Sequence, residues 1–409
     1  MTATIVFYSI IFILVLNFIF DKWLDYLNFQ HFTDKIPNEL KDVYDEEQYL
    51  KSQHYKKETY HFSLLISLIS FFTMMVFLFF DGFAHVDKIA RNITTNETLI
   101  SLLFFGILSI GITFLTTPIS YYKTFVIEEK FGFNKTTKKL FFIDKIKGIL
   151  LSTLIGGIIL YIIILFYNQF GINFWIFALI VITVFSVFLN MFYSTLIVPL
   201  FNKQTPLEEG NLKKSLEAFV KKAGFKLDQL FVIDGSKRST RANAYFAGFG
   251  PKKRVVLYDT LINDLETEEI VAVLAHEIGH YKHKHIIYNF IIGTLITAIT
   301  LFLLSIFINN ELLAQALGIS NPNFHIGLIA FGLLYTPISE ITGLINNIIS
   351  RKFEYQADNF AKKYGLGIAL INGLKKLSKN NLSNLTPHSW YVFYHYSHPT
   401  LLQRYKNLN

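Results

Sequence analysis

The residues best suited to chemistry form a short motif, HEIGH, at positions 276–280. His276 and His280 are four residues apart, so on a helix they lie about 40° apart on one face, one turn above the other. Both imidazoles can then bind one ion, and Glu277 projects beside that ion, where its carboxylate can act as a general base. Two neutral imidazoles suit Zn²⁺, and this H-E-x-x-H spacing is typical of zinc peptidases.

A catalytic zinc site also needs a third protein ligand, with a fourth position left open. The segment SRKFEYQADNFAKKYG (350–365) offers one. Glu354 and Asp358 are again four residues apart, so Glu354 can bind the ion while Asp358 accepts the N–H of a zinc-bound histidine. Two non-functional explanations remain open. An H-E-x-x-H match can arise by chance, and an E-x-x-x-D pair often lies on a solvated helix face.

Two further histidines, His283 and His285, follow the motif closely. If the helix continues, His283 lies about two turns, roughly 10 Å, from His276, which is too far to share the ion. We expect these two residues to mark a membrane interface or to help orient entering water. Cysteine is absent from the chain, so any metal must be held by histidines and carboxylates.

The helices and strands that position these residues can be recognised in the sequence. Before HEIGH, Thr267 can cap a helix, and Glu268 and Glu269 in its first turn suit the helix dipole. Residues 208–223 show helical spacing of Leu and Val, with lysines on the other face. The runs LFVID, NAYFAG and RVVLYD (230–234, 243–248 and 254–259) are β-type and indicate a small sheet or hairpin.

The composition indicates that these elements belong to a membrane protein. The 409 residues are 52% hydrophobic and only 17% charged, with 42 phenylalanines, which indicates a mainly α-helical, polytopic membrane protein. Seven apolar stretches are long enough to cross a bilayer. They lie near 4–20, 62–80, 98–117, 147–166, 173–197, 286–309 and 324–349.

Lysine and arginine predict the orientation, because these residues stay on the cytoplasmic side. Segments 21–61, 118–146, 198–285 and 350–409 hold six, six, fourteen and nine of them, against two in 81–97 and none in the other loops. The N-terminus is therefore expected outside, and the HEIGH segment and C-terminal tail in the cytoplasm. This topology and attraction to anionic lipid explain the net charge of +8, which gives no support to a nucleic-acid role.

These signals divide the chain into four parts. We expect five transmembrane helices with their loops in 1–197 and a cytoplasmic metalloprotease segment, with the small sheet and the HEIGH helix, in 198–285. Residues 286–349 would form helices six and seven, and 350–409 a cytoplasmic tail that completes the zinc site.

Several motifs together resemble the type I CAAX prenyl proteases, and the resemblance covers nearly the whole chain. Besides HEIGH and SRKFEYQAD (350–358) they are GSKRSTRANAYF (235–246), SHPTLLQR (397–404), EEKFGFNKTT (128–137) and PLFNK (199–203). The resemblance implies seven helices in a barrel around an intramembrane chamber, with the metal site at its cytoplasmic end. It also implies that one zinc ion is bound by His276, His280 and Glu354, with Glu277 as general base.

Further residues take their roles from the same resemblance. His398 matches the position that stabilises the oxyanion, and Arg404 lies nearby, although a histidine before proline is often only a turn residue. NAYFAG would be an edge strand to which an extended peptide adds, with Asn243 and Ala244 in contact with it.

Polar residues inside apolar segments, namely Asn190, Glu340, Asn346 and Asn347, would face the chamber. Glu340 is about four helical turns before Glu354 and would share its face, or else form a salt bridge near the helix end.

The family is named for removing the last three residues of prenylated tails, which implies a peptide or protein substrate in the bilayer. A quality-control protease with no prenyl requirement is the alternative function. A seven-helix transporter or receptor with a structural metal is a third, and Glu277 argues against it because such a site needs no base. The bias towards Ile, Asn, Lys and Phe favours a bacterial inner membrane over the endoplasmic reticulum, and we expect a monomer.

Overall fold

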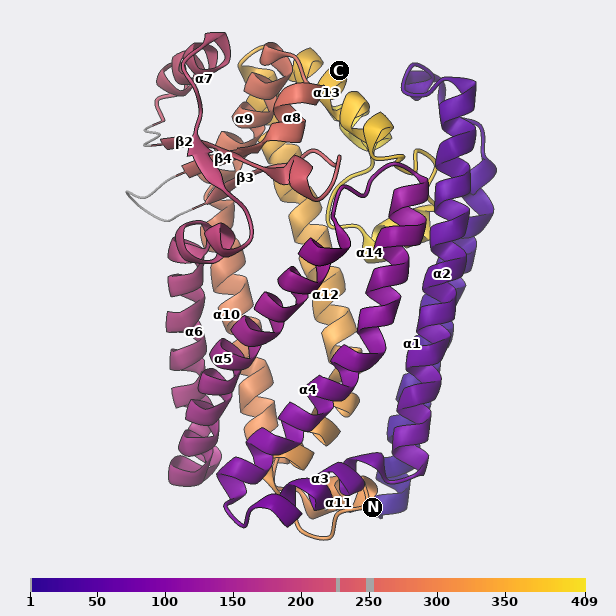
Figure 1. Cartoon of the computed structure of the whole chain (residues 1–409), viewed down its shortest axis with the longest axis vertical. Helices are drawn as coiled ribbons and strands as arrows, with labels where there is room; N and C mark the ends of the chain where they lie inside the picture. Colours follow the sequence, from indigo (N-terminus) through magenta and orange to yellow (C-terminus); the bar gives the residue numbers. More distant parts are fainter. Residues whose placement is uncertain (1, 226–228, 248–253) are drawn as a thin grey trace.

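The computed structural model describes residues 2–225, 229–247 and 254–409. Its long helices form a tall barrel, with a small sheet and several short helices at one end and the short helices α3 (Gly82–Ile93) and α11 (Glu311–Ala316) at the other (Figure 1). The seven long helices are α1 (Ala3–Gln30), α2 (Glu46–Phe79), α4 (Glu97–Tyr122), α5 (Lys138–Phe170), α6 (Phe174–Phe192), α10 (His285–Phe307) and α12 (Phe324–Lys363). Each predicted span corresponds to one of them.

Among the described residues, six helical segments are long and apolar enough to cross a membrane. The longest, Lys138–Leu200, combines α5 and α6, which reverse direction at Gly171, where φ is +53°. The side chain of Lys147 near the start of α5 donates to the carbonyl of Leu200 just beyond α6, as two antiparallel helices require. The prediction of seven membrane helices therefore holds, with two of them in one continuous segment.

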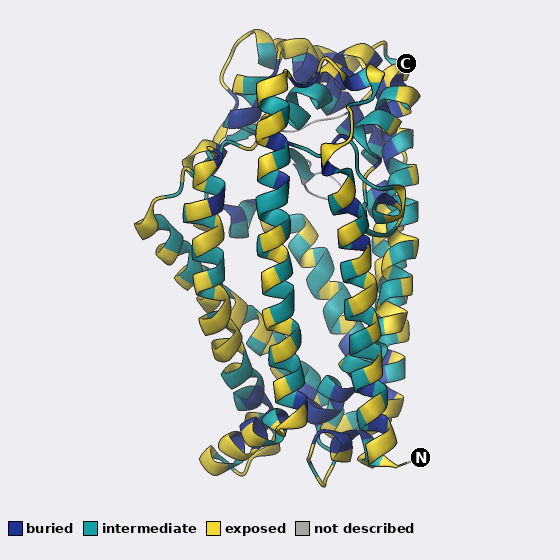
Figure 2. Ribbon diagram, turned by 90° about the vertical axis from the view of Figure 1, so that its right-hand side faces the viewer, coloured by how far each residue is buried: buried dark blue, intermediate teal, exposed yellow. Residues whose placement is uncertain are grey.

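Side chains along the barrel are rarely buried. In the apolar windows of the six segments only 6% to 17% of the residues are buried. Figure 2 shows exposed and intermediate residues along the length of these helices. This open barrel is the architecture expected around an intramembrane chamber. At the end that carries the N-terminus, α3 and α11 pack across the opening.

The other end carries a compact domain built around a four-stranded mixed sheet. The strands are β1 (Gln204–Pro206), β2 (Gln229–Ile233), β3 (Ala244–Ala247) and β4 (Arg254–Tyr258), in the order β1-β2-β4-β3. β2 and β4 are parallel, and β3 pairs antiparallel with β4. The small sheet is confirmed, β1 is an addition to it, and Gly248 of NAYFAG lies outside the described residues.

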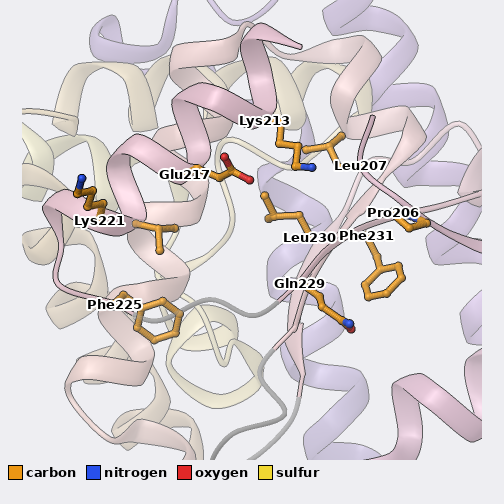
Figure 3. Close-up of a pocket in the computed structure, with 10 residues that line it drawn as sticks. Pro206, Leu207, Lys213, Glu217, Lys221, Phe225, Gln229, Leu230 and Phe231 are labelled. Carbon is orange, nitrogen blue, oxygen red and sulfur yellow. The ribbon is translucent and has the colours of Figure 1, made fainter. Parts of the chain in front are cut away.

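Short helices cover this sheet. They are α7 (Asn211–Lys222), α8 (Asp259–Asp264), α9 (Thr267–Lys282), α13 (Gly367–Asn380) and α15 (Leu401–Leu408), whereas α14 (Ser389–His395) packs against α12 and α1. A shared apolar core includes Leu216 of α7, Leu257 of β4, Leu274 of α9 and Leu370 of α13. A surface pocket of about 550 Å³ opens between α7 and β2 (Figure 3), and none of its lining residues belongs to the HEIGH or Glu354 segments.

Helix α9 begins one residue earlier than the capping prediction requires. Glu266 occupies the cap position, and its backbone N–H donates to the carboxylate of Glu269 at 2.8 Å. Thr267 is the first residue of the helix rather than its cap. Glu269 also accepts from Lys376 of α13, so that the start of α9 is tied to α13.

Gly279 sets how closely α9 packs on α12. A methyl group at this position would lie 2.9 Å from Cα of Ala357 and 3.0 Å from Cβ of Phe360, both on α12. The glycine of the motif therefore leaves room for a neighbouring helix, and this close approach brings Glu354 and Asp358 against the histidines.

Gly279→Ala tests this packing. Alanine ordinarily stabilises a helix interior by about 1 kcal/mol relative to glycine, but here the methyl would collide with α12. We expect the free energy of unfolding to fall by about 1–3 kcal/mol, measured as a lower melting temperature in detergent. Gly343→Ala on α12 is the control, because a methyl there meets no described atom within 4 Å. Equal melting temperatures would contradict the close packing.

Candidate active site

Helices α9 and α12 bring three potential metal ligands together. One ligand atom from each of His276, His280 and Glu354 lies within 4.8 Å of the others. The two Nε2 atoms are 3.1 Å apart, and they lie 3.4 Å and 3.3 Å from the carboxylate oxygens of Glu354. His276 and Glu354 are buried, with exposed fractions of 7% and 5%.

The donor set fits a divalent metal ion. Among the described residues, Oε2 of Glu354 is buried and has no hydrogen-bond partner. Two imidazole nitrogens and one carboxylate are the ligand types that zinc accepts in catalytic sites. The surrounding buried groups, Glu354, Asp358 and Arg404, carry one net negative charge, which a divalent cation would offset.

Asp358 and Arg404 hold the side of the His276 ring that faces away from His280 and Glu354. Asp358 is fully buried and accepts from Nδ1 of His276 at 2.9 Å. Arg404, on α15, donates to both oxygens of Asp358 and reaches within 3.8 Å of Glu354. His276 is thus hydrogen-bonded to Asp358, and Arg404 fixes the carboxylate that accepts this bond.

Glu277 and His398 both lie beside the ligand cluster. Glu277 is partly exposed and close enough to His276 to favour the charged form of that ring. Nε2 of His398 is 3.4 Å from Glu354, and its side chain is 65% exposed. The segment 397–404 therefore places both His398 and Arg404 at the site.

Asn243 and Ala244 lie at the start of β3, an outermost strand of the sheet.

His285 lies where the sequence did not predict it. α9 ends at Lys282, and Lys284 adopts a left-handed φ of 60°, so His285 begins a new helix. Its Nδ1 is 2.9 Å from Nδ1 of His280, whereas a continuous helix would have carried it away from the site. Nothing in the sequence marks this break, because a left-handed residue is usually glycine. His283 is exposed and stacks on His285.

Polar residues of α12 form hydrogen bonds with α14 and with the residue that follows it. Glu340 accepts from the hydroxyl of Tyr394 at 2.7 Å, so the predicted alternative of a salt bridge is not what the structure shows. Asn347 donates to the carbonyl of Tyr394 at 2.7 Å, and Arg351 donates to the carbonyl of Tyr396. One face of α12 thus fixes α14 and the chain leading to His398. Asn190 donates to a carbonyl of its own helix.

Comparison with known proteins identifies the family of this chain. Residues 25–203 match a family model described as CAAX prenyl protease N-terminal, five membrane helices, and residues 206–409 match peptidase family M48. CAAX prenyl protease 1 of Saccharomyces cerevisiae is 37% identical over 417 residues, covering 95% of this chain and 92% of that protein. This chain belongs to the CAAX prenyl protease family.

Two further relatives extend the match. The CAAX prenyl protease 1 homolog of Homo sapiens is 33% identical and covers 92% of this chain and 89% of its own. The crystal structure of S. mikatae Ste24p has a TM-score of 0.94 and 37% identity, covering 99% of both chains. Membership of the CAAX prenyl protease family makes the chain a multi-pass membrane metalloendopeptidase, which confirms the predicted fold and enzyme class. The relatives named here are eukaryotic, so the expected bacterial inner-membrane location finds no support.

Metal binding should depend on pH through His276. Burial opposes a charge on this ring, but the hydrogen bond to Asp358 and the nearby carboxylate of Glu354 raise its pKa to about 9. Below that pH the metal-free ring is protonated, and a metal ion must displace the proton. We expect the apparent zinc affinity to fall as the pH is lowered from 8.5 to 6.5, by up to about tenfold per unit. Competition with a chelator measures it, and a constant affinity across this range would contradict the assignment.

Proposed function

We propose that this chain binds one zinc ion through His276, His280 and Glu354 and hydrolyses peptide bonds beside it. The observation that carries the proposal is the convergence of these ligand atoms on one point from two helices. When bound, zinc would supply a Lewis acid that polarises the scissile carbonyl and lowers the pKa of a water molecule.

The chain's own residues would move the protons. Glu277 would take the proton of the attacking water and later pass it to the leaving amine. His398 would donate a hydrogen bond to the oxyanion of the tetrahedral intermediate, since its exposed ring borders the ligand cluster. Asp358, held by Arg404, would keep the Nδ1 proton of His276 in place, so that Nε2 of His276 faces the metal.

An extended substrate would bind by adding to β3. β3 is an outermost strand of the sheet, and main-chain hydrogen bonds along such an edge hold a peptide whatever its side chains are. Asn243 lies just before the strand, with its own carbonyl accepting from Tyr258 of β4 and its side chain accepting from the N–H of Ala244. The side chain of Asn243 and the backbone of Ala244 would contact the substrate at the start of this edge.

The names of the relatives support a substrate class. Their names describe CAAX prenyl proteases, and we propose that this chain removes the C-terminal tripeptide from prenylated CAAX tails. The lysine and arginine distribution supports a cytoplasmic active site, because the basic segments 198–285 and 350–409 form the domain that carries it. We propose that the enzyme acts as a monomer in the bilayer.

Glu277→Gln separates metal binding from turnover. The variant keeps both histidines and Glu354, so it should bind one zinc ion like the wild type, while peptide cleavage falls by about 10²–10⁴-fold because the base is lost. Metal analysis and a cleavage assay on the same detergent preparation give both values. Glu268→Gln, at the exposed start of the same helix, is the control and should keep full activity. Normal turnover by Glu277→Gln would contradict the proposed base.

A pair of substrates tests the prenyl requirement. We expect wild-type protein in liposomes to cleave a farnesylated CAAX peptide and to leave its unprenylated twin largely intact, because the lipid holds the tail at the membrane. Mass spectrometry of the products identifies the bond that is cut. Equal cleavage of both peptides would favour the quality-control function, and cleavage of neither would contradict the proposed substrate class.

A further inference from the structure

A buried histidine with no assigned role contacts the metal-ligand cluster. His285 is 2% exposed, and its Nδ1 lies 2.9 Å from Nδ1 of His280. Its other ring nitrogen, Nε2, lies 2.7 Å from the side-chain oxygen of Gln356 on α12. Phe353 stacks on the same ring, with centroids 4.1 Å apart and planes 9° apart. Both nitrogens and one face of the ring are therefore fixed by neighbours.

The direction of these hydrogen bonds follows from the metal ligand. Nε2 of His280 faces His276 and Glu354, so this is the atom that would bind zinc. A histidine bound through Nε2 carries its proton on Nδ1 and donates it to a partner. His285 must then accept at Nδ1, and its single proton lies on Nε2, from which it donates to Gln356.

We propose that His285 is a positioning residue that holds the ring of His280 for the metal. It acts through two hydrogen bonds between uncharged groups, from His280 to His285 and from His285 to Gln356, which we call the His285 relay. It rests on the zinc site of the proposed function, and it adds a residue that contacts a ligand histidine rather than the ion. Asp358 and Arg404 give His276 an ionic support, whereas His280 receives one without charge.

The backbone supplies a second, independent observation. Lys284 adopts a left-handed conformation, with φ at 60°, which residues with a side chain rarely adopt. Strained residues of this kind persist where the surrounding structure requires them, and they cluster at functional sites. Here the break ends α9 and turns His285 back towards His280. A helix continuing through this point would have left His280 without its hydrogen-bond acceptor.

Zinc affinity of the full-length protein in detergent, measured by chelator competition, tests the relay. His285→Leu removes the acceptor and should weaken zinc binding by about 10–100-fold. His285→Asn places an amide oxygen where Nδ1 was, so it should recover most of that loss. His54→Asn, at an exposed ring on α2, is the control and should bind zinc like the wild type.

Gln356→Glu gives a readout that a purely structural role would not change. An anionic acceptor at the end of the relay makes His280 a more basic ligand, so zinc should bind more tightly than in the wild type. More electron donation also weakens the metal as a Lewis acid, so the acid limb of the pH profile of kcat/KM should move to higher pH. Gln356 is exposed, and its substitution leaves the packing around His285 in place.

Three results would overturn the relay. His285→Leu could bind zinc as tightly as the wild type, or His285→Asn could lose as much affinity as His285→Leu. Gln356→Glu could also leave both affinity and pH profile unchanged. In each case a wild type that binds zinc and cleaves peptide would leave the proposed function standing. A wild type that binds no zinc would instead overturn the proposed function and the relay together.

Discussion

The contact between α9 and α12 at Gly279 is the constraint on which the active site depends. Each helix alone offers one pair of side chains four residues apart, and neither pair makes a three-ligand site. Because Gly279 has no side chain, the backbone of α12 at Ala357 approaches closely enough for Glu354 to reach both histidines. α12 continues from the barrel into the domain, so one continuous helix joins the membrane helices to the metal-ligand cluster (Figure 1).

Burying so many ionisable groups in one place requires each to have a partner. Asp358 is balanced by Arg404 and His276, and a divalent cation would balance Glu354. Arg404 comes from the last helix of the chain, so the site is complete only when the C-terminal segment packs against α12. That segment also carries His398, which joins ligand support and the proposed oxyanion contact in one stretch of sequence.

The parts of this account that could be predicted from sequence are those set by local geometry. The four-residue spacing of His276 and His280 fixes their common face on any helix, and long apolar runs identify the membrane helices. The partner of Glu340 could not be predicted, because Tyr394 reaches it only after α14 folds against α12. The contact between His285 and His280 could not be predicted, because it requires a break in the helix, and the break lies at a lysine rather than at a glycine.

X-ray absorption at the zinc edge, on detergent-purified protein, tests directly whether α9 and α12 form a zinc site. We expect one zinc per chain with a shell of nitrogen and oxygen only, at about 2.0–2.1 Å. We also expect the outer-shell scattering of two imidazole rings, reduced to one ring in either His276→Ala or His280→Ala. A zinc signal without imidazole scattering, or one unchanged by both substitutions, would contradict the site formed by α9 and α12.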